Sequence, residues 1–231
     1  MPPTTDAHTT ALITAICTGA TGTLRRLLSD HPELAHARVD GRTPLHIATD
    51  WPGHFPNAGA TIAALVEAGA DVNARFEGAH TETPLHWAAS SNDVEALDAL
   101  LDAGADIDAD GAVIAGGTPL TDARAFAQWD TARRLVERGA RTTLADAATL
   151  GLLDRVRTHF PGATSEEANE AFWGACHGGR RSCADYLLSR GADVNWLPPW
   201  EPLTPLDAAR RSGATDLARW LLEQGAVSAV R

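Results

Sequence analysis

The sequence has no lysine, only three cysteines and no long apolar run. All 19 basic residues are arginine and they face 30 acidic residues, so the net charge is −11. That charge repels a phosphate backbone, and no arginine-rich stripe offsets it, so we expect no nucleic-acid binding. No stretch of 18 apolar residues occurs, and we therefore expect no membrane-spanning helix and no membrane partner.

The few cysteines are also informative about the compartment. Cys17, Cys176 and Cys183 form an odd, sparse set without the spacing of a disulfide framework, which predicts reduced thiols in a cytoplasmic protein. Residues 1–6 have neither the basic region nor the apolar stretch of a signal peptide, in line with that prediction. Cys176, His177 and Cys183 offer three potential ligands but no CxxC or HxxxH pair, so we predict no metal site.

A four-residue motif, Thr-Pro-Leu followed by His, Thr or Asp, recurs along the chain. It begins at Thr43, Thr83, Thr118 and Thr204. A second signal, Gly-Ala-Asp or a variant of it, follows the threonine after 21 residues in the units that start at Thr83, Thr118 and Thr204. Two signals in fixed phase indicate a repeated structural unit.

Each residue of the motif has a mechanical role. Threonine is a favourable N-cap, and proline fits the first helical position because the N–H that it lacks would have no partner there. A second stretch with apolar residues at helical spacing follows, for example Val94–Leu101. Gly104 then ends it, because glycine readily adopts the left-handed conformation after a helix. The repeat therefore predicts a helix–turn–helix unit.

A period of about 33 residues that carries Thr-Pro-Leu-His resembles the ankyrin repeat family. The resemblance covers nearly the whole chain, from about Thr9 to Val227, and the leading unit resembles the first repeat of many bacterial ankyrin proteins. It implies an all-α solenoid of about seven helix-turn-helix units with short β-hairpin fingers. We expect a flexible N-terminus over residues 1–8 and a single ankyrin-repeat domain over residues 9–231. The units are anchored at Thr10, Thr43, Thr83, Thr118, Thr142, Glu170 and Thr204.

The repeat is irregular in three places. About five residues are inserted around Trp51–Asn57, which makes either a binding lobe or a loop whose aromatic residues pack beneath it. One finger is missing mid-array, between Gly139 and Thr142, which either admits a ligand or marks a decayed repeat. The finger Trp196–Pro202 carries two tryptophans, which serve either as rigid contact anchors or as a cover for the end of the stack.

The resemblance implies a concave groove lined by finger tips and inner helices. Recognition is expected just before the motif threonine and seven or eight residues after it, whereas His46 and His86 are expected to be structural. With the aromatic and histidine residues of the irregular loops, the predicted partner-binding residues are Arg42, Asp50, Trp51, His54, Phe55, His80, Glu82, Ser90, Ser91, Phe126, His177, Trp196, Trp200, Glu201 and Arg211. The expected function is non-catalytic binding of a protein or peptide, with a basic partner favoured by the net charge.

The alternative is a small-molecule-binding or catalytic pocket in the groove around repeats four to six. Asp122, His177 and Asp50 would be its acid and base candidates, since a buried Asp122 would have a raised pKa. Asp122 would otherwise pair with Arg124 or with a neighbouring repeat. The sequence has no GxSxG, P-loop or HExxH motif, so binding is favoured over catalysis and no cofactor is predicted. A third possibility is a structural spacer within a larger assembly.

Overall fold

The computed structural model describes residues 7–229, and the chain divides into two compact units, Met1–Ala140 and Arg141–Arg231. Among the described residues there are fourteen α-helices and one short 3-10 helix, so the all-α prediction is confirmed. The fingers are turns rather than strand ladders, and the bridge between Val39 and Arg42 is isolated. The predicted flexible segment 1–8 lies outside the described residues except for Ala7 and His8, with which the first helix begins.

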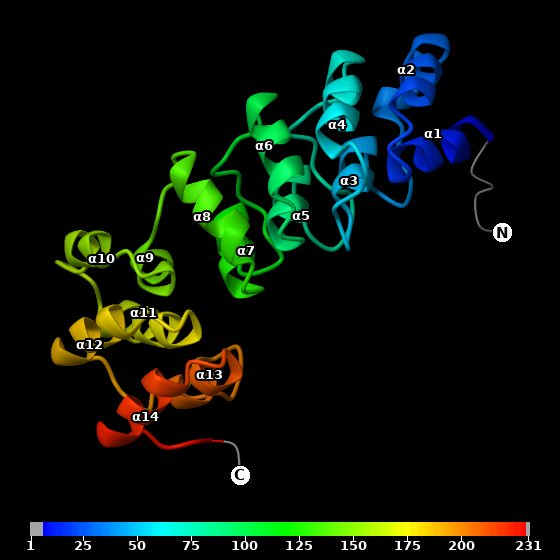
Figure 1. Cartoon of the computed structure of the whole chain (residues 1–231). Helices are drawn as coiled ribbons and strands as arrows, with labels where there is room; N and C mark the ends of the chain where they lie inside the picture. The colour runs from blue at the N-terminus through cyan, green and yellow to red at the C-terminus, as the bar shows by residue number, and fades with distance from the viewer. Residues whose placement is uncertain (1–6, 230–231) are drawn as a thin grey trace. The chain divides into compact units, whose positions relative to one another are not determined.

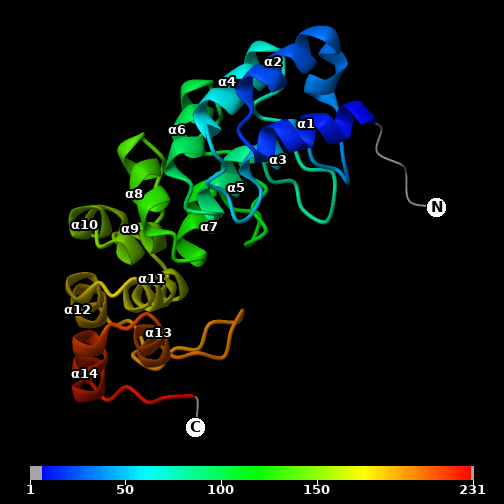
Figure 2. The ribbon, with the colours of Figure 1, turned by 45° about the vertical axis from the view of Figure 1, so that its right-hand side comes forward.

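The helices of the first unit follow one another in antiparallel pairs that form two rows (Figures 1 and 2). Helices α1, α3, α5 and α7 pack side by side in the inner row, and α2, α4, α6 and α8 in the outer row. The bounds are α1 Ala7–Cys17, α2 Thr21–Asp30, η1 Pro32–His36, α3 Pro44–Thr49, α4 Ala58–Glu67, α5 Pro84–Ser90, α6 Val94–Asp102, α7 Pro119–Ala125 and α8 Trp129–Glu137.

The second unit repeats the arrangement with a longer helix at its centre. The inner helix α11 packs against α9 on one side and α13 on the other, and the loop before α13 projects away from the helices (orange in Figure 2). The bounds are α9 Leu144–Leu150, α10 Leu153–His159, α11 Ser165–His177, α12 Arg181–Ser189, α13 Pro205–Arg211 and α14 Thr215–Glu223.

The inner helices begin where the motif predicts, because a threonine and the residue three positions later cap each other. The backbone N–H of Thr43 donates to Nδ1 of His46 over 3.3 Å, and the backbone N–H of Thr204 donates to a carboxylate oxygen of Asp207 over 3.2 Å. The same reciprocal cap starts α5, α7, α9 and α11. His, Thr, Asp and Glu are interchangeable at this position because each offers an acceptor to the threonine N–H.

Three predicted anchors do not begin their helices. Thr10 lies inside α1, the cap of α9 is Thr143 rather than Thr142, and the cap of α11 is Thr164, six residues before the predicted anchor Glu170, which keeps the register of the repeat. Thr164 and Glu167 form a capping box, with the Thr164 N–H donating to Oε2 of Glu167 over 2.8 Å. This capping box therefore starts α11 before the position that the repeat register predicts.

The core consists of leucines and alanines from facing helices. The motif leucines Leu45, Leu85, Leu120 and Leu206 have no exposed surface. Full burial of one such side chain stabilises the fold by about 2 kcal/mol, so each repeat adds a similar increment. In the second unit Phe172 occupies the position of the motif leucine and is also fully buried.

Candidate partner-binding surfaces

The inserted loop of the first unit spans residues 50–57, between α3 and α4. Trp51 is 80% exposed, whereas Phe55 is half-buried, so the tryptophan does not pack beneath its own loop. The loop is tied to both neighbouring repeats. The backbone N–H of His54 donates to Asp93 over 2.5 Å, and the side-chain amide of Asn57 donates to the Gly19 carbonyl over 3.0 Å.

Two further candidates lie at the base of this loop and bind each other. Nη1 of Arg42 donates to Oδ2 of Asp50 over 2.8 Å, and the backbone N–H of Trp51 donates to the other carboxylate oxygen over 2.9 Å. Arg42 also pairs with the exposed Asp40 at 3.3 Å. Asp50 therefore fixes the start of the loop, and both of its oxygens are engaged.

Glu82 lies just before α5 and is only 6% exposed, so its carboxylate accepts hydrogen bonds inside the protein rather than facing a partner. It accepts hydrogen bonds from Nε1 of Trp87 over 2.8 Å and from the backbone N–H of Val113 over 3.0 Å. Nδ1 of His80 lies 2.9 Å from the same carboxylate. Glu82 thus ties the finger of the next repeat to α5. Ser91, another predicted partner-binding residue, is also buried.

Asp122, on α7, has no exposed surface. Burial is the main cause that raises its pKa to about 8, and a hydrogen bond with Glu82 and the negative charge of Glu82 add to it. The backbone N–H of Ile114 acts in the opposite direction. The neighbour that contributes to the raised pKa, Glu82, comes from the preceding repeat.

The motif histidines link consecutive repeats, as predicted. Nε2 of His46 lies 3.1 Å from the carbonyl oxygen of Glu82, and Nε2 of His86 lies 3.4 Å from that of Gly117. Burial lowers the pKa of each imidazole to about 4. Both rings therefore stay neutral near pH 7, with Nδ1 accepting from the cap and Nε2 donating to the next finger.

Arginines at the base of the first two fingers hold the finger that follows each. Arg38 donates to the carbonyl oxygen of Arg75 over 2.9 Å and pairs with Glu77 at 3.1 Å. Arg75 in turn pairs with Asp110 at 2.8 Å and donates to its carbonyl oxygen. The fingers of the first unit are therefore coupled in sequence, which limits the freedom that binding would have to remove.

The remaining exposed apolar side chains of the first unit lie on the same elements. Phe126 follows the end of α7 and is 47% exposed, and Val113 and Ile114 are exposed on the finger before α7. Ser90, at the end of α5, donates to the Trp87 carbonyl over 3.1 Å. Sequence reasoning missed Val113 and Ile114, because they lie in mid-finger rather than beside the motif threonine.

The second unit holds an aromatic cluster around the loop before α13. Trp200 meets Trp173 and Trp196 edge to face, with ring centroids 6.0 and 5.6 Å apart, and it is 54% exposed. Trp173 on α11 is buried, stacks on His177 at 5.4 Å and donates Nε1 to the Leu203 carbonyl over 2.8 Å. Trp173 was not predicted as a site residue, because it occupies the position of the structural motif histidine.

A charged pair adjoins this cluster. Nη1 of Arg211 donates to Oε2 of Glu201 over 2.6 Å, and Nη2 donates to Oε1 over 3.1 Å. The guanidinium carbon of Arg211 also lies 5.7 Å from the ring centroid of Trp173. His177, Trp196, Trp200, Glu201 and Arg211 were all predicted, and the structure brings them together.

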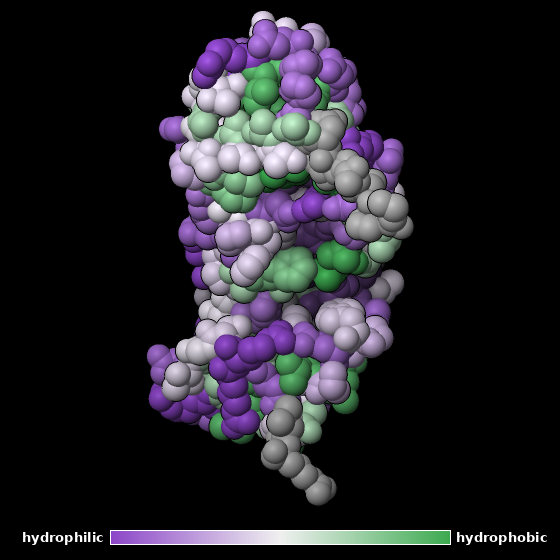
Figure 3. Space-filling view, turned by 90° about the vertical axis from the view of Figure 1, so that its right-hand side faces the viewer, coloured by the Kyte–Doolittle hydropathy of each residue, from purple (hydrophilic) through white to green (hydrophobic). Residues whose placement is uncertain are grey.

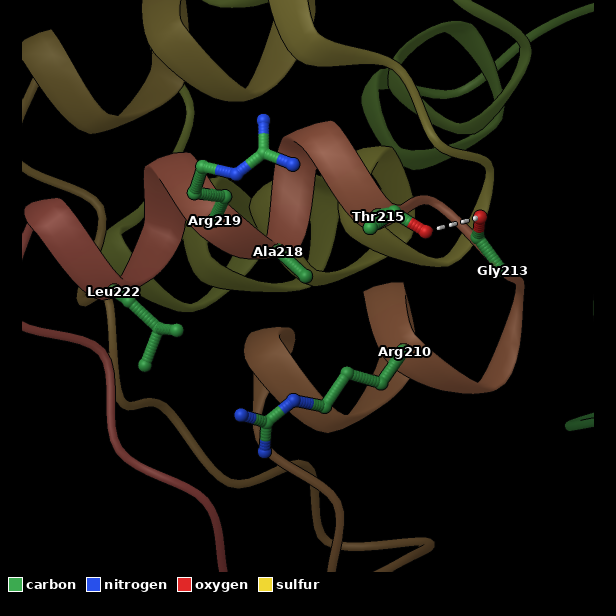
Figure 4. A pocket seen from close by; sticks show the side chains of 6 residues that line it. All are labelled: Arg210, Gly213, Thr215, Ala218, Arg219 and Leu222. Atoms are coloured by element: carbon green, nitrogen blue, oxygen red, sulfur yellow. Dashed lines mark hydrogen bonds between the residues drawn. The ribbon is translucent and has the colours of Figure 1, made fainter.

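Two open hollows lie among the helices of the second unit, away from the acid and base candidates. One, of about 360 Å³, is lined by Arg210, Gly213, Thr215, Ala218, Arg219 and Leu222 and is shown in Figure 4. The other, of about 410 Å³, is lined by residues of α10 and α12. Asp122 and His177 belong to different units and line neither hollow.

Burial makes two of the thiols poor nucleophiles. Burial raises the pKa of Cys176 strongly and that of Cys183 to about 11, so both stay protonated thiols near neutral pH.

Within residues 7–229, no three His, Cys, Asp or Glu side chains are grouped to hold a metal ion. The same residues include no helix that is long and apolar enough to cross a membrane. On the face drawn in Figure 3, hydrophobic patches are small and separated by polar surface.

Comparison with known proteins agrees with the repeat. The family model "Ankyrin repeats (3 copies)" matches residues 3–76 and 57–146, which together span more than half of the chain. The crystal structure of the human ASB11 ankyrin repeat domain superposes with a TM-score of 0.57 over 91% of this chain and 96% of that one, at 20% identity. The structural match extends over both units, whereas the family model stops soon after the start of the second. The chain belongs to the ankyrin repeat family.

Proposed function

We propose that this chain binds a protein or peptide through the first unit, at a surface made by the ends of its inner helices and by its fingers. Ankyrin repeats are generally protein-binding modules. The observation that carries the proposal is Trp51, which is 80% exposed on a loop that hydrogen bonds hold to both neighbouring repeats. An exposed indole on a rigid support is favourable for binding, because little conformational freedom is lost when a partner covers it.

Phe126 supplies a second anchor on this surface. Trp51 follows α3 and Phe126 follows α7, and α5 packs between these two helices. Neighbouring helices pack about 8–10 Å apart, so the two aromatic residues lie roughly 20 Å from each other. A partner that covers both is a peptide segment or a protein surface rather than a small molecule, and Val113 and Ile114 extend the apolar area on the finger side.

The distribution of charge supports a basic partner. Residues 1–140 contain 9 arginines and 19 acidic residues, a net charge of −10, whereas residues 141–231 contain 10 and 11, a net charge of −1. Nearly all of the excess negative charge therefore belongs to the unit that carries Trp51. Such a field speeds the approach of a positively charged partner and weakens as salt is added.

The proposal includes a single array of seven repeats in a bacterial-type, cytoplasmic protein, with one finger missing between Gly139 and Thr142. The consecutive helix pairs support the repeat count, and the short connection 138–143 supports the missing finger. The lack of a disulfide framework among three cysteines supports the location. Binding is preferred to catalysis because the perturbed carboxyl, Asp122, has no exposed surface that a substrate can reach.

Affinity capture from an extract of the cells that make the protein tests this function. The comparison uses the wild-type chain, a Trp51→Ala/Phe126→Ala variant and a Leu222→Ala/Val227→Ala control, which also removes two exposed apolar side chains, from the other unit. We expect partners that the wild type and the control retain and that the Trp51→Ala/Phe126→Ala variant loses by at least about tenfold. Equal retention by all three proteins would refute the proposed surface.

A further inference from the structure

The aromatic cluster of the second unit has the composition of a site for a cation. The Trp200 ring is inclined at 85° to that of Trp173 and at 68° to that of Trp196, so it packs edge to face with both. The faces of indole rings carry negative charge density and attract a cation within about 6 Å. Glu201, on the same loop, adds a carboxylate beside these rings, and its side chain is partly exposed.

The chain itself shows which cation fits. Arg211 places its guanidinium carbon 5.7 Å from the ring centroid of Trp173 and donates two hydrogen bonds to the two oxygens of Glu201. This is the planar, two-pronged recognition that arginine makes with a carboxylate and that an ammonium group does not reproduce. In the free protein, an internal guanidinium therefore lies against Trp173 and engages both oxygens of Glu201, with Trp200 and Trp196 packed beside Trp173.

We propose that the group formed by Trp173, Trp196, Trp200 and Glu201 binds an arginine side chain of a protein partner, which replaces Arg211. The Arg211 and Glu201 side chains are both partly exposed, so a partner arginine can reach Glu201 and take over the two hydrogen bonds that Arg211 makes, which keeps the exchange nearly balanced. The loop that carries the site includes Pro198, Pro199 and Pro202 and presents its tryptophans with restricted backbone freedom.

The neighbouring surface also suits a protein partner. Leu197 is exposed on the same loop, and more than half of Trp200 is exposed, so apolar area surrounds the cation site. A partner segment that inserts an arginine would therefore cover these side chains at the same time. This inference concerns the second unit alone and does not rest on the surface proposed around Trp51.

Titration of the full chain with N-acetyl-arginine amide, followed by NMR of the indole N–H signals, tests the site. The proteins compared are the wild type, Arg211→Met, which vacates the site but keeps an apolar stem, and Arg211→Met/Glu201→Gln. Arg219→Met is the matched control, since Arg219 is an arginine of the same unit that pairs with Asp216 outside the cluster. N-acetyl-citrulline amide serves as the uncharged probe of similar shape.

We expect Arg211→Met to bind the arginine probe at least about tenfold more tightly than the wild type or Arg219→Met, with shifts at Trp173, Trp196 and Trp200. Adding Glu201→Gln should reverse the gain by about tenfold, because a charged, bidentate contact is lost. Equal binding of the citrulline probe, an unchanged affinity after Glu201→Gln, or no binding by Arg211→Met would overturn the inference. Arg211→Gln replaces Arg211→Met if the latter shows altered thermal unfolding. A negative result in the affinity capture with the Trp51 variant leaves these outcomes unaffected.

Discussion

Replacing Asp122 with asparagine is expected to stabilise the protein, and the gain should grow as the pH rises. In the folded protein burial is the largest cause that raises the pKa of Asp122 to about 8, from an ordinary value of 3.8. Between these values the folded chain keeps a proton on Asp122 that the unfolded chain releases. The stability of the wild type therefore falls with rising pH, by about 1.4 kcal/mol per pH unit at the steepest. Asparagine has the shape of the neutral acid and carries no such cost.

The difference in unfolding free energy between Asp122→Asn and the wild type should increase by about 2–3 kcal/mol between pH 5 and pH 7. Urea unfolding at both pH values, followed by circular dichroism, measures it. Asp207→Asn is a control for which the opposite result is expected. Burial alone would raise the pKa of Asp207, but hydrogen bonds from Ser228, Ala229 and Thr204 lower it overall. The Asp207→Asn variant should therefore lose stability. An Asp122→Asn difference that is equal at pH 5 and pH 7 would show that Asp122 is ionised in the folded protein.

Three further changes test the fold and the loop. Asp93→Ala removes both the N-cap of α6 and the acceptor of the His54 N–H. The free energy of unfolding in urea should fall by about 1 kcal/mol, and hydrogen exchange in loop 50–57 should become faster. Unchanged exchange would contradict the role of Asp93 in holding the loop. Leu85→Ala should cost about 2–5 kcal/mol, because the side chain is fully buried, and a loss below 1 kcal/mol would count against the packing. Burial lowers the pKa of His46 and His86 to about 4, so the free energy of unfolding should fall as the pH drops from about 6.5 towards 4. In the His46→Asn/His86→Asn variant, the free energy of unfolding should depend less on pH over this range.

The sequence was sufficient to predict the helix pairs, since motif and terminator recur in fixed phase. It failed where the repeat departs from the consensus. Thr164 and Glu167 have the spacing of a capping box, but the repeat register placed the anchor of this unit at Glu170, so α11 begins earlier and is longer than the repeat requires. In a degenerate repeat, a capping box predicts the start of a helix better than the repeat register does, because the hydrogen bonds of the cap determine where the helix starts.

The candidate surfaces were predictable by position but not by exposure. Trp51 and Glu82 were both chosen from their distance to a motif threonine, yet one is 80% and the other 6% exposed. The contact between Glu82 and Asp122 depends on which way two side chains of adjacent repeats point, and spacing along the chain does not specify that. Trp173 was missed for a related reason, since its position normally holds a structural residue.

The most direct test of the proposed function is site-specific photo-crosslinking in the cells that make the protein. A photoreactive phenylalanine analogue replaces Trp51 in one variant and Leu222 in another, both exposed side chains, in the first and second units respectively. The account predicts a discrete protein adduct at position 51 that position 222 does not give, and that disappears when Phe126→Ala is added. Adducts of the same proteins at both positions, or none at position 51, would contradict it.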